Sequence, residues 1–139
     1  MNSEDEPIAK EEYILRLIWK DFFIDGVPPK ISERAFRPRP DETDGISVFR
    51  ESCLSDPNEI LNVIAEAKRE KYAIVRLPVY ELLAMGLSVR SSKIESLAGH
   101  AVVPELNIVA LHSDMKQTQK LQNALAEIAK NNVIQKPTN

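Results

Sequence analysis

Proline or glycine ends most of the apolar segments in this chain, and these boundaries restrict the fold to short elements. Such boundaries lie at Gly26, Pro78, Gly86 and Pro104. Proline cannot continue a helix or a hydrogen-bonded ladder, and glycine commonly follows the last turn of a helix. The strands are therefore expected to be too short for a doubly wound parallel sheet.

Hydrophobic spacing predicts the type of each segment. Leu15, Ile18, Trp19 and Phe22 recur at helical spacing, which predicts a helix from residue 11 to about residue 25. Further helices are expected at 55–71, 79–85 and from a cap at Ser113 or Asp114 to about 131. Short strands are expected at 45–50, 72–77, 87–90 and 100–104, with 108–111 as a fifth candidate.

These elements together predict an α+β fold in a single compact domain. It would contain about four helices and four or five short strands, with a long C-terminal helix. The expected boundaries are a flexible N-terminus at 1–7, a globular domain at 8–133 and a flexible tail at 134–139. The strand–helix–strand order between residues 45 and 77 permits a right-handed parallel crossover.

Composition bounds the functional classes. The chain has 139 residues and a formal net charge of −3, so it has no global positive field that would attract nucleic acid. Nucleic acid is therefore an unlikely partner. The acidic start and the lack of an 18-residue apolar run predict a cytoplasmic protein without a membrane segment.

Chemical motifs are few. Cys53 is the only cysteine, so no internal disulfide can form, and no spacing of cysteine and histidine indicates a metal site. Glycine-rich phosphate loops are absent as well. No metal and no cofactor are expected.

The stretch R-A-F-R-P-R-P, residues 34–40, is the strongest candidate for a binding site. Proline favours extended backbone, in which Arg37 and Arg39 would point to the same side and could clamp one anion. Arg50 follows shortly after and is a third candidate. The alternative is that nearby acids, Asp41 among them, neutralise these arginines.

Three further residues are candidates because of their positions. Asp44 and Ser47 flank the start of an expected strand, where they could line a pocket mouth, although Asp44 could equally bond its own turn. His100 follows Gly99, and its imidazole could act as an acid, a base or a ligand. The alternative is a strand-end histidine bonded to a carbonyl. His100 is the candidate catalytic residue.

Several stretches resemble small uncharacterised bacterial proteins. The resemblance rests on A-F-x-P-x-P at 35–40, D-G-x-S-V-x-R at 44–50 and G-H-A-x-x-P at 99–104. It implies one compact bacterial domain with Arg37, Asp44, Ser47 and His100 at its distinctive positions. The last helix lies outside the resemblance.

Two functions are compatible with these features, and the sequence favours the first. The first is a non-catalytic protein-interaction or accessory module, which would bind a protein partner or form a homo-oligomer through its amphipathic terminal helices. The alternative is a small nucleotide- or phosphate-binding enzyme, in which the arginine loop grips phosphate near His100. Binding of a nucleotide or another phosphorylated small molecule would favour the enzyme over the interaction module.

Overall fold

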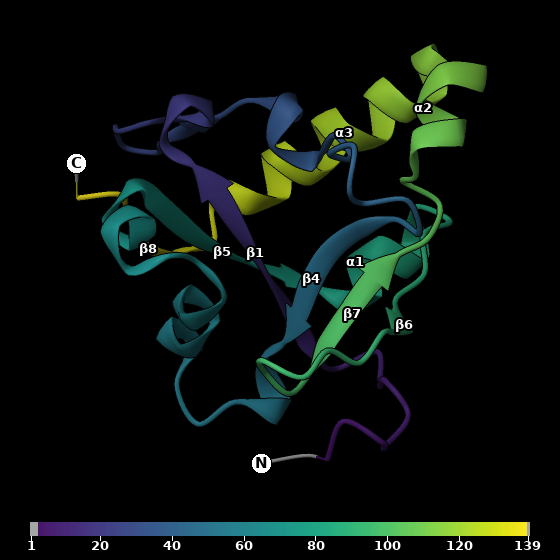
Figure 1. Cartoon of the computed structure of the whole chain (residues 1–139). Coiled ribbons are helices and arrows are strands. Elements are labelled where there is room, and N and C mark those ends of the chain that lie inside the picture. Colours follow the sequence, from purple (N-terminus) through teal and green to yellow (C-terminus); the bar gives the residue numbers. More distant parts are fainter. Residues whose placement is uncertain (1–2, 139) are drawn as a thin grey trace.

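The computed structural model describes residues 3–138 and has an α+β architecture built on one six-stranded sheet (Figure 1). The strands in chain order are β1 (Tyr13–Trp19), β4 (Ile46–Arg50), β5 (Tyr72–Pro78), β6 (Arg90–Ser91), β7 (His100–Val103) and β8 (Val133–Gln135). Their order in the sheet is β6-β7-β4-β1-β5-β8, and every neighbouring pair is antiparallel. β2 (Phe23–Ile24) and β3 (Lys30–Ile31) form a separate two-stranded ribbon.

Three α-helices and five 3₁₀ helices occur within residues 3–138. The α-helices are α1 (Val79–Ala84), α2 (Ile108–Ser113) and α3 (Met115–Ala129). The 3₁₀ helices are η1 (Lys20–Phe22), η2 (Glu33–Phe36), η3 (Glu51–Cys53), η4 (Pro57–Val63) and η5 (Glu66–Lys71). The α+β class and the long C-terminal helix are as expected from the sequence. No helix in the described part of the chain is long and apolar enough to cross a bilayer.

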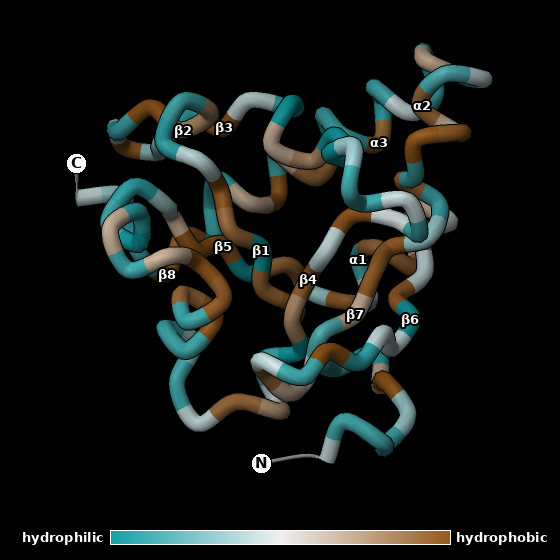
Figure 2. Tube along the Cα trace, in the orientation of Figure 1, coloured by the Kyte–Doolittle hydropathy of each residue, from teal (hydrophilic) through white to brown (hydrophobic). Residues whose placement is uncertain are grey.

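The sheet is buried on both faces. Alternate residues of β1 divide between two apolar clusters, with Ile14 and Ile18 on the α3 side and Leu15 on the side of η4. Figure 2 shows hydrophobic residues concentrated along the central strands. Burial on both faces explains why these strands are almost continuously apolar.

The predicted helix at 11–25 is wrong. Residues 13–19 form the central strand β1, which pairs with β5 along its whole length from Tyr13 to Trp19. A strand buried on both faces has a continuous apolar run, and such a run also satisfies helical spacing. The segment therefore lacked a pattern that could distinguish the two structures.

Three smaller predictions also differ from the structure. The expected fifth strand at 108–111 is the helix α2, whose first turn is capped by the Asn107 side chain accepting from the N–H of Ala110 at 2.8 Å. The helix expected at 55–71 consists of η4 and η5, separated at Ile64. In place of the strand expected at 87–90, the structure has the two-residue strand β6, Arg90–Ser91.

Parts of the two expected terminal segments contact the domain in the described residues. Residues 134 and 135, the start of the expected tail, belong to β8 on the edge of β5. Residues 3–7 lie against buried Arg50, whose side chain holds their carbonyl groups. Residues 1–2 and 139 of these two segments lie outside the described residues.

Candidate functional site

The site begins where β1 and β4 separate. These strands pair at Ile14 with Arg50 and at Leu15 with Phe49, and the pairing stops there. The Arg16 side chain bridges the widening gap by donating to the Ser47 carbonyl at 2.8 Å. Two further bonds, from Arg16 to the Ala35 carbonyl at 2.9 and 3.1 Å, link this gap to η2. Arg16 thus closes one side of an opening in the sheet.

Glu42 holds the loop that covers this opening. Its carboxylate accepts from Arg16 at 2.9 Å and from the backbone N–H groups of Arg39 and Ser47 at 2.9 and 2.6 Å. Burial by itself would raise the pKa of Glu42, but the Arg16 guanidinium and the two backbone donors lower it to about 2. The carboxylate is therefore ionised and fixes the loop between η2 and β4.

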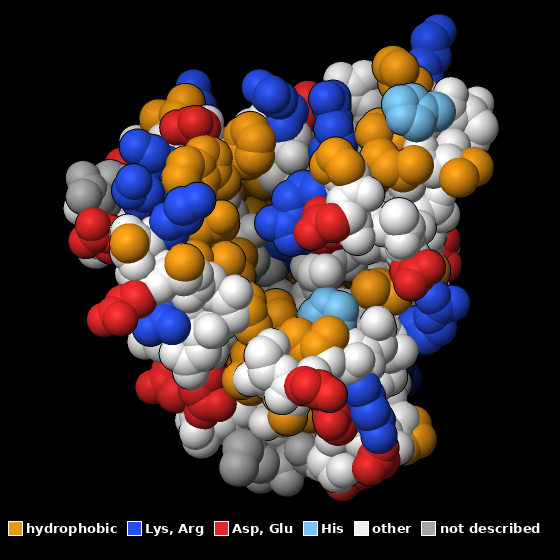
Figure 3. Space-filling model, in the orientation of Figure 1, with side chains coloured by type: hydrophobic (Ala, Val, Ile, Leu, Met, Phe, Trp, Pro, Cys, Tyr) orange, Lys and Arg blue, Asp and Glu red, His pale blue; other side chains and the backbone are white. Residues whose placement is uncertain are grey.

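A cavity of about 370 Å³ lies over the opening, and we call it the His100 pocket. Its apolar lining comes from β1, β4, the segment around η4 and the loop before β7: Leu17, Phe49, Val63, Ile64 and Ile94. Its polar lining consists of Arg16, Arg39, Asp41, Ser47 and His100. Figure 3 shows the corresponding hollow in this face, with hydrophobic side chains inside it and basic side chains above it. The pocket combines apolar walls with a few hydrogen-bonding groups, as small-molecule sites do.

The imidazole of His100 is fixed in one orientation. Its Nδ1 lies 2.5 Å from the Ser92 carbonyl, so Nδ1 carries the proton and donates it. The ring also packs edge-on against Phe49 with the ring centroids 5.2 Å apart. Nε2 has no bond within residues 3–138, and in this tautomer it is a hydrogen-bond acceptor. His100 is therefore bonded to a carbonyl and also lines the pocket.

A second cavity of about 280 Å³ adjoins the first, and we call it the arginine pocket. It is lined by Arg16, Leu17, Trp19, Phe22, Arg34, Ala35, Arg37, Arg39 and Tyr72. Four guanidinium groups and three aromatic rings thus surround it, without an acidic side chain in the lining. The Arg34 guanidinium lies over the Phe22 ring at 5.2 Å, which orients it.

The two pockets form one cleft, because both are lined by Arg16, Leu17 and Arg39. The arginines that line this cleft differ in whether an acidic side chain pairs with them. Arg16 pairs with Glu42, and Arg39 lies 3.3 Å from Glu42 and 3.7 Å from Asp41. Arg34 and Arg37 have no acidic partner within residues 3–138. The excess positive charge therefore lies at the arginine-pocket end.

The residues singled out from the sequence divide into two groups. Arg39, Ser47 and His100 line the His100 pocket, and Arg37 and Arg39 both line the arginine pocket. The buried Pro38 separates these two arginines, and both line the arginine pocket. Asp44 is exposed in the turn before β4 and lines neither pocket.

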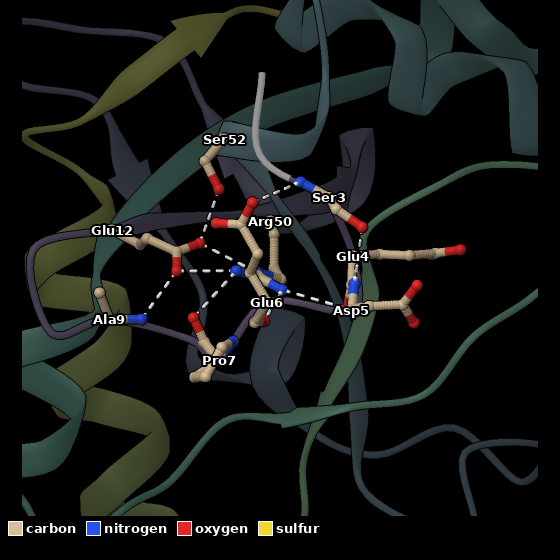
Figure 4. Close-up of polar contacts among 9 residues, drawn as sticks. All are labelled: Ser3, Glu4, Asp5, Glu6, Pro7, Ala9, Glu12, Arg50 and Ser52. Carbon is tan, nitrogen blue, oxygen red and sulfur yellow. Dashed lines mark hydrogen bonds and ion pairs between the residues drawn. The ribbon is translucent and has the colours of Figure 1, made fainter.

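Arg50 lies apart from the cleft and is fully buried (Figure 4). It forms a bidentate pair with Glu12 at 2.9 Å and donates to the carbonyls of Glu4, Glu6 and Pro7 at 2.8–3.4 Å. Burial by itself would raise the pKa of Glu12, but the bonds from Arg50, the Ala9 N–H and the Ser52 hydroxyl lower it. All five donors of Arg50 are occupied, so it joins the N-terminal segment to the sheet.

Sequence reasoning missed Arg16 and the aromatic residues Trp19 and Tyr72. Arg16 was the one charge inside an apolar run, Y-I-L-R-L-I-W, and that exception was a signal. Trp19 and Tyr72 lie opposite each other on β1 and β5, which no local pattern indicates.

Comparison with known proteins adds no family: no family model matches the chain, and neither the curated proteins nor the solved structures gave a match. Within residues 3–138, no three histidine, cysteine, aspartate or glutamate side chains gather as a metal site.

Proposed function

We propose that the protein binds a phosphate-bearing small molecule of the nucleotide class in the cleft formed by the His100 and arginine pockets. One observation carries the proposal: the cleft is apolar at one end and has two unneutralised arginines at the other. A nucleotide has the same division, with a flat base at one end and phosphate at the other. Guanidinium groups bind phosphate oxygens through paired donors.

The His100 pocket would hold the base. Its volume of about 370 Å³ lies in the range of roughly 300–1,000 Å³ that is common for small-molecule sites. The Phe49 ring and the aliphatic side chains suit the faces of a base, and Ser47 and Nε2 of His100 suit its polar edge. His100 would be the residue closest to any reacting group, with Nε2 as proton acceptor.

Isothermal titration calorimetry with a panel of nucleotides and sugar phosphates tests this proposal. We expect saturable binding by at least one nucleotide, and a loss of at least about tenfold in affinity when Phe49→Ala removes the apolar wall. Leu83→Ala is a matched control, since Leu83 is an exposed apolar residue of α1 outside both pockets. Absence of binding by every phosphorylated compound at millimolar concentration would refute the proposal.

A second candidate is self-association through the corner between α2 and α3. Val109 and Met115 are large apolar residues there, exposed by 72% and 62%. The other amphipathic element of the interaction hypothesis, the N-terminal helix, is instead the buried strand β1, so this corner is what supports the hypothesis. Light scattering at rising concentration tests it, with Val109→Glu as the disrupting variant and exposed Val27→Glu as its control. A monomer throughout the concentration series would exclude it.

A cytoplasmic location stays a proposal as well. The single cysteine, Cys53, is buried with a free thiol, which suits a reducing compartment. Cell fractionation of the native host would test the location.

A further inference from the structure

We infer that the cleft selects a nucleoside polyphosphate over a monophosphate, with the phosphate chain extending from the neck at Arg39 to Arg34 and Arg37. This inference rests on the proposed function and adds the length of the phosphate chain. Its basis is the uneven distribution of unpaired cations along the cleft.

The neck between the two pockets would take the first phosphate. Arg16 and Arg39 line both pockets there, so a ligand that passes from one pocket to the other must contact them. Four of the five Arg16 donors are already bonded within the protein, and Arg39 shares its charge with Glu42 and Asp41. The neck can therefore hold one phosphate but has little charge left for a second.

The arginine pocket would take the later phosphates. Arg34 and Arg37 are exposed and lack an acidic partner within the described chain, so their charges are free to pair with an anion. The cavity of about 280 Å³ between them and Arg16 is empty space that a monophosphate at the neck would leave unfilled. Two free guanidinium groups match the two phosphate groups beyond the first.

The aromatic residues at this end would position the cations. The Arg34 guanidinium lies over the face of the Phe22 ring, 5.2 Å from its centroid. The Trp19 and Tyr72 rings support each other edge-on with centroids 5.1 Å apart. Preorganised cations lose less side-chain entropy when they bind an anion. Phe22 is thus a positioning residue for the terminal phosphates.

The test compares AMP, ADP and ATP, and the guanosine series, by calorimetry in EDTA. We expect each added phosphate to tighten binding about tenfold, since a charge-assisted bond contributes about 1.4 kcal/mol or more. The double variant Arg34→Gln/Arg37→Gln should remove this gain, so that the variant binds ATP no more tightly than it binds AMP. Phe22→Leu should also reduce the difference in affinity between ATP and AMP. Arg90→Gln, an exposed arginine on β6 outside the cleft, is the matched control.

The outcomes separate this inference from the proposed function. Equal affinities for AMP and ATP, or an ATP gain that survives the double variant, would overturn the inference and leave nucleotide binding intact. Inorganic tripolyphosphate provides a further arm: binding as tight as that of ATP would show that the His100 pocket does not hold a base, and would overturn the nucleoside part. No binding by any of these probes would refute both, and circular dichroism confirms that each variant is folded.

Discussion

Replacing Glu42 by glutamine should destabilise the protein, because this carboxylate neutralises buried Arg16 and holds the loop over the cleft. Both side chains are almost fully buried, with 2% and 6% of their surfaces exposed. Glutamine keeps the shape but removes the charge, and one of its two terminal atoms becomes a donor. Arg16 would then lie buried without its counter-ion.

The magnitude follows from the pKa of Glu42, which is about 2 in the folded protein instead of 4.5. A depression of this size corresponds to about 3 kcal/mol of stability at neutral pH. Because the folded pKa is depressed, this stability is present above about pH 4.5 and is lost as the pH falls toward 2. By the same linkage relation only about 1 kcal/mol remains at pH 3.

Urea unfolding at pH 7 and pH 3, followed through the fluorescence of the single tryptophan Trp19, measures this difference. We expect the variant to be less stable by about 3 kcal/mol at pH 7 and by only about 1 kcal/mol at pH 3. Other carboxylates titrate in both proteins and cancel in the comparison. Asp44→Asn, an exposed acid in the same loop, should leave the midpoint unchanged. A difference that is independent of pH would refute the assignment to the Glu42 charge.

Three further experiments test other parts of the structure. Gly45→Ala should lower the free energy of unfolding by about 3 kcal/mol or more, measured by thermal unfolding, because the new Cβ would lie 2.3 Å from the Val103 carbonyl oxygen. Gly86→Ala is the control: Gly86 also has a positive φ but lies in open space, so this variant should lose only about 1 kcal/mol, and equal losses would count against the steric argument. Arg50→Lys should loosen the N-terminal segment because lysine cannot reproduce five donors, so limited proteolysis at 3–11 should accelerate, and unchanged cleavage would contradict this role. The pKa of Cys53 is raised, mainly by burial, so its thiol should react with a disulfide reagent at least about tenfold more slowly in the native protein than in urea; equal rates would contradict its burial.

Local sequence patterns predicted the elements whose ends carry their own chemistry. β5 ends at Pro78, and α1 begins directly after it, as expected from proline at a helix start. α3 is capped by Asp114, whose carboxylate accepts from the Gln117 N–H at 3.2 Å. In both cases residues within four positions of the boundary determine it, so the local sequence is enough to predict where the element begins.

The central strand could not be predicted in the same way. β1 is a strand because β4 and β5 lie on either side of it, and these partners come 27 and 53 residues after its end. Its residues satisfy both helical spacing and double-sided burial. Only pairing with distant strands decides between a helix and a strand here, and such pairing cannot be recognised from neighbouring residues in the sequence. The same reason hid Trp19 and Tyr72 as neighbours in the arginine pocket.

The candidate site shows how position in the fold separates residues of one chemical type. The arginines on the central strands, Arg16, Arg50 and Arg76, each pair with a carboxylate: Glu42, Glu12 and Glu51. Arg16 and Arg50 are buried, and a charge buried in a sheet must be neutralised within the protein because water cannot solvate it there. The Arg76 side chain is 37% exposed, so its pair with Glu51 is only partly buried. These arginines therefore stabilise the structure, and Arg50 belongs with them although its spacing resembled that of the loop arginines.

Arg34 and Arg37 differ because they lie at the surface, where water already solvates their charges and no internal acid is required. A surface cation without a partner is ordinary by itself, but these two line a cavity that is continuous with an apolar pocket. A dianionic phosphate entering that cavity gains both pairings without breaking an ion pair of the protein. Arg39 would instead have to weaken its contacts with Glu42 and Asp41. For this reason Arg34 and Arg37, and not the better buried arginines, should determine how much each phosphate beyond the first adds to binding.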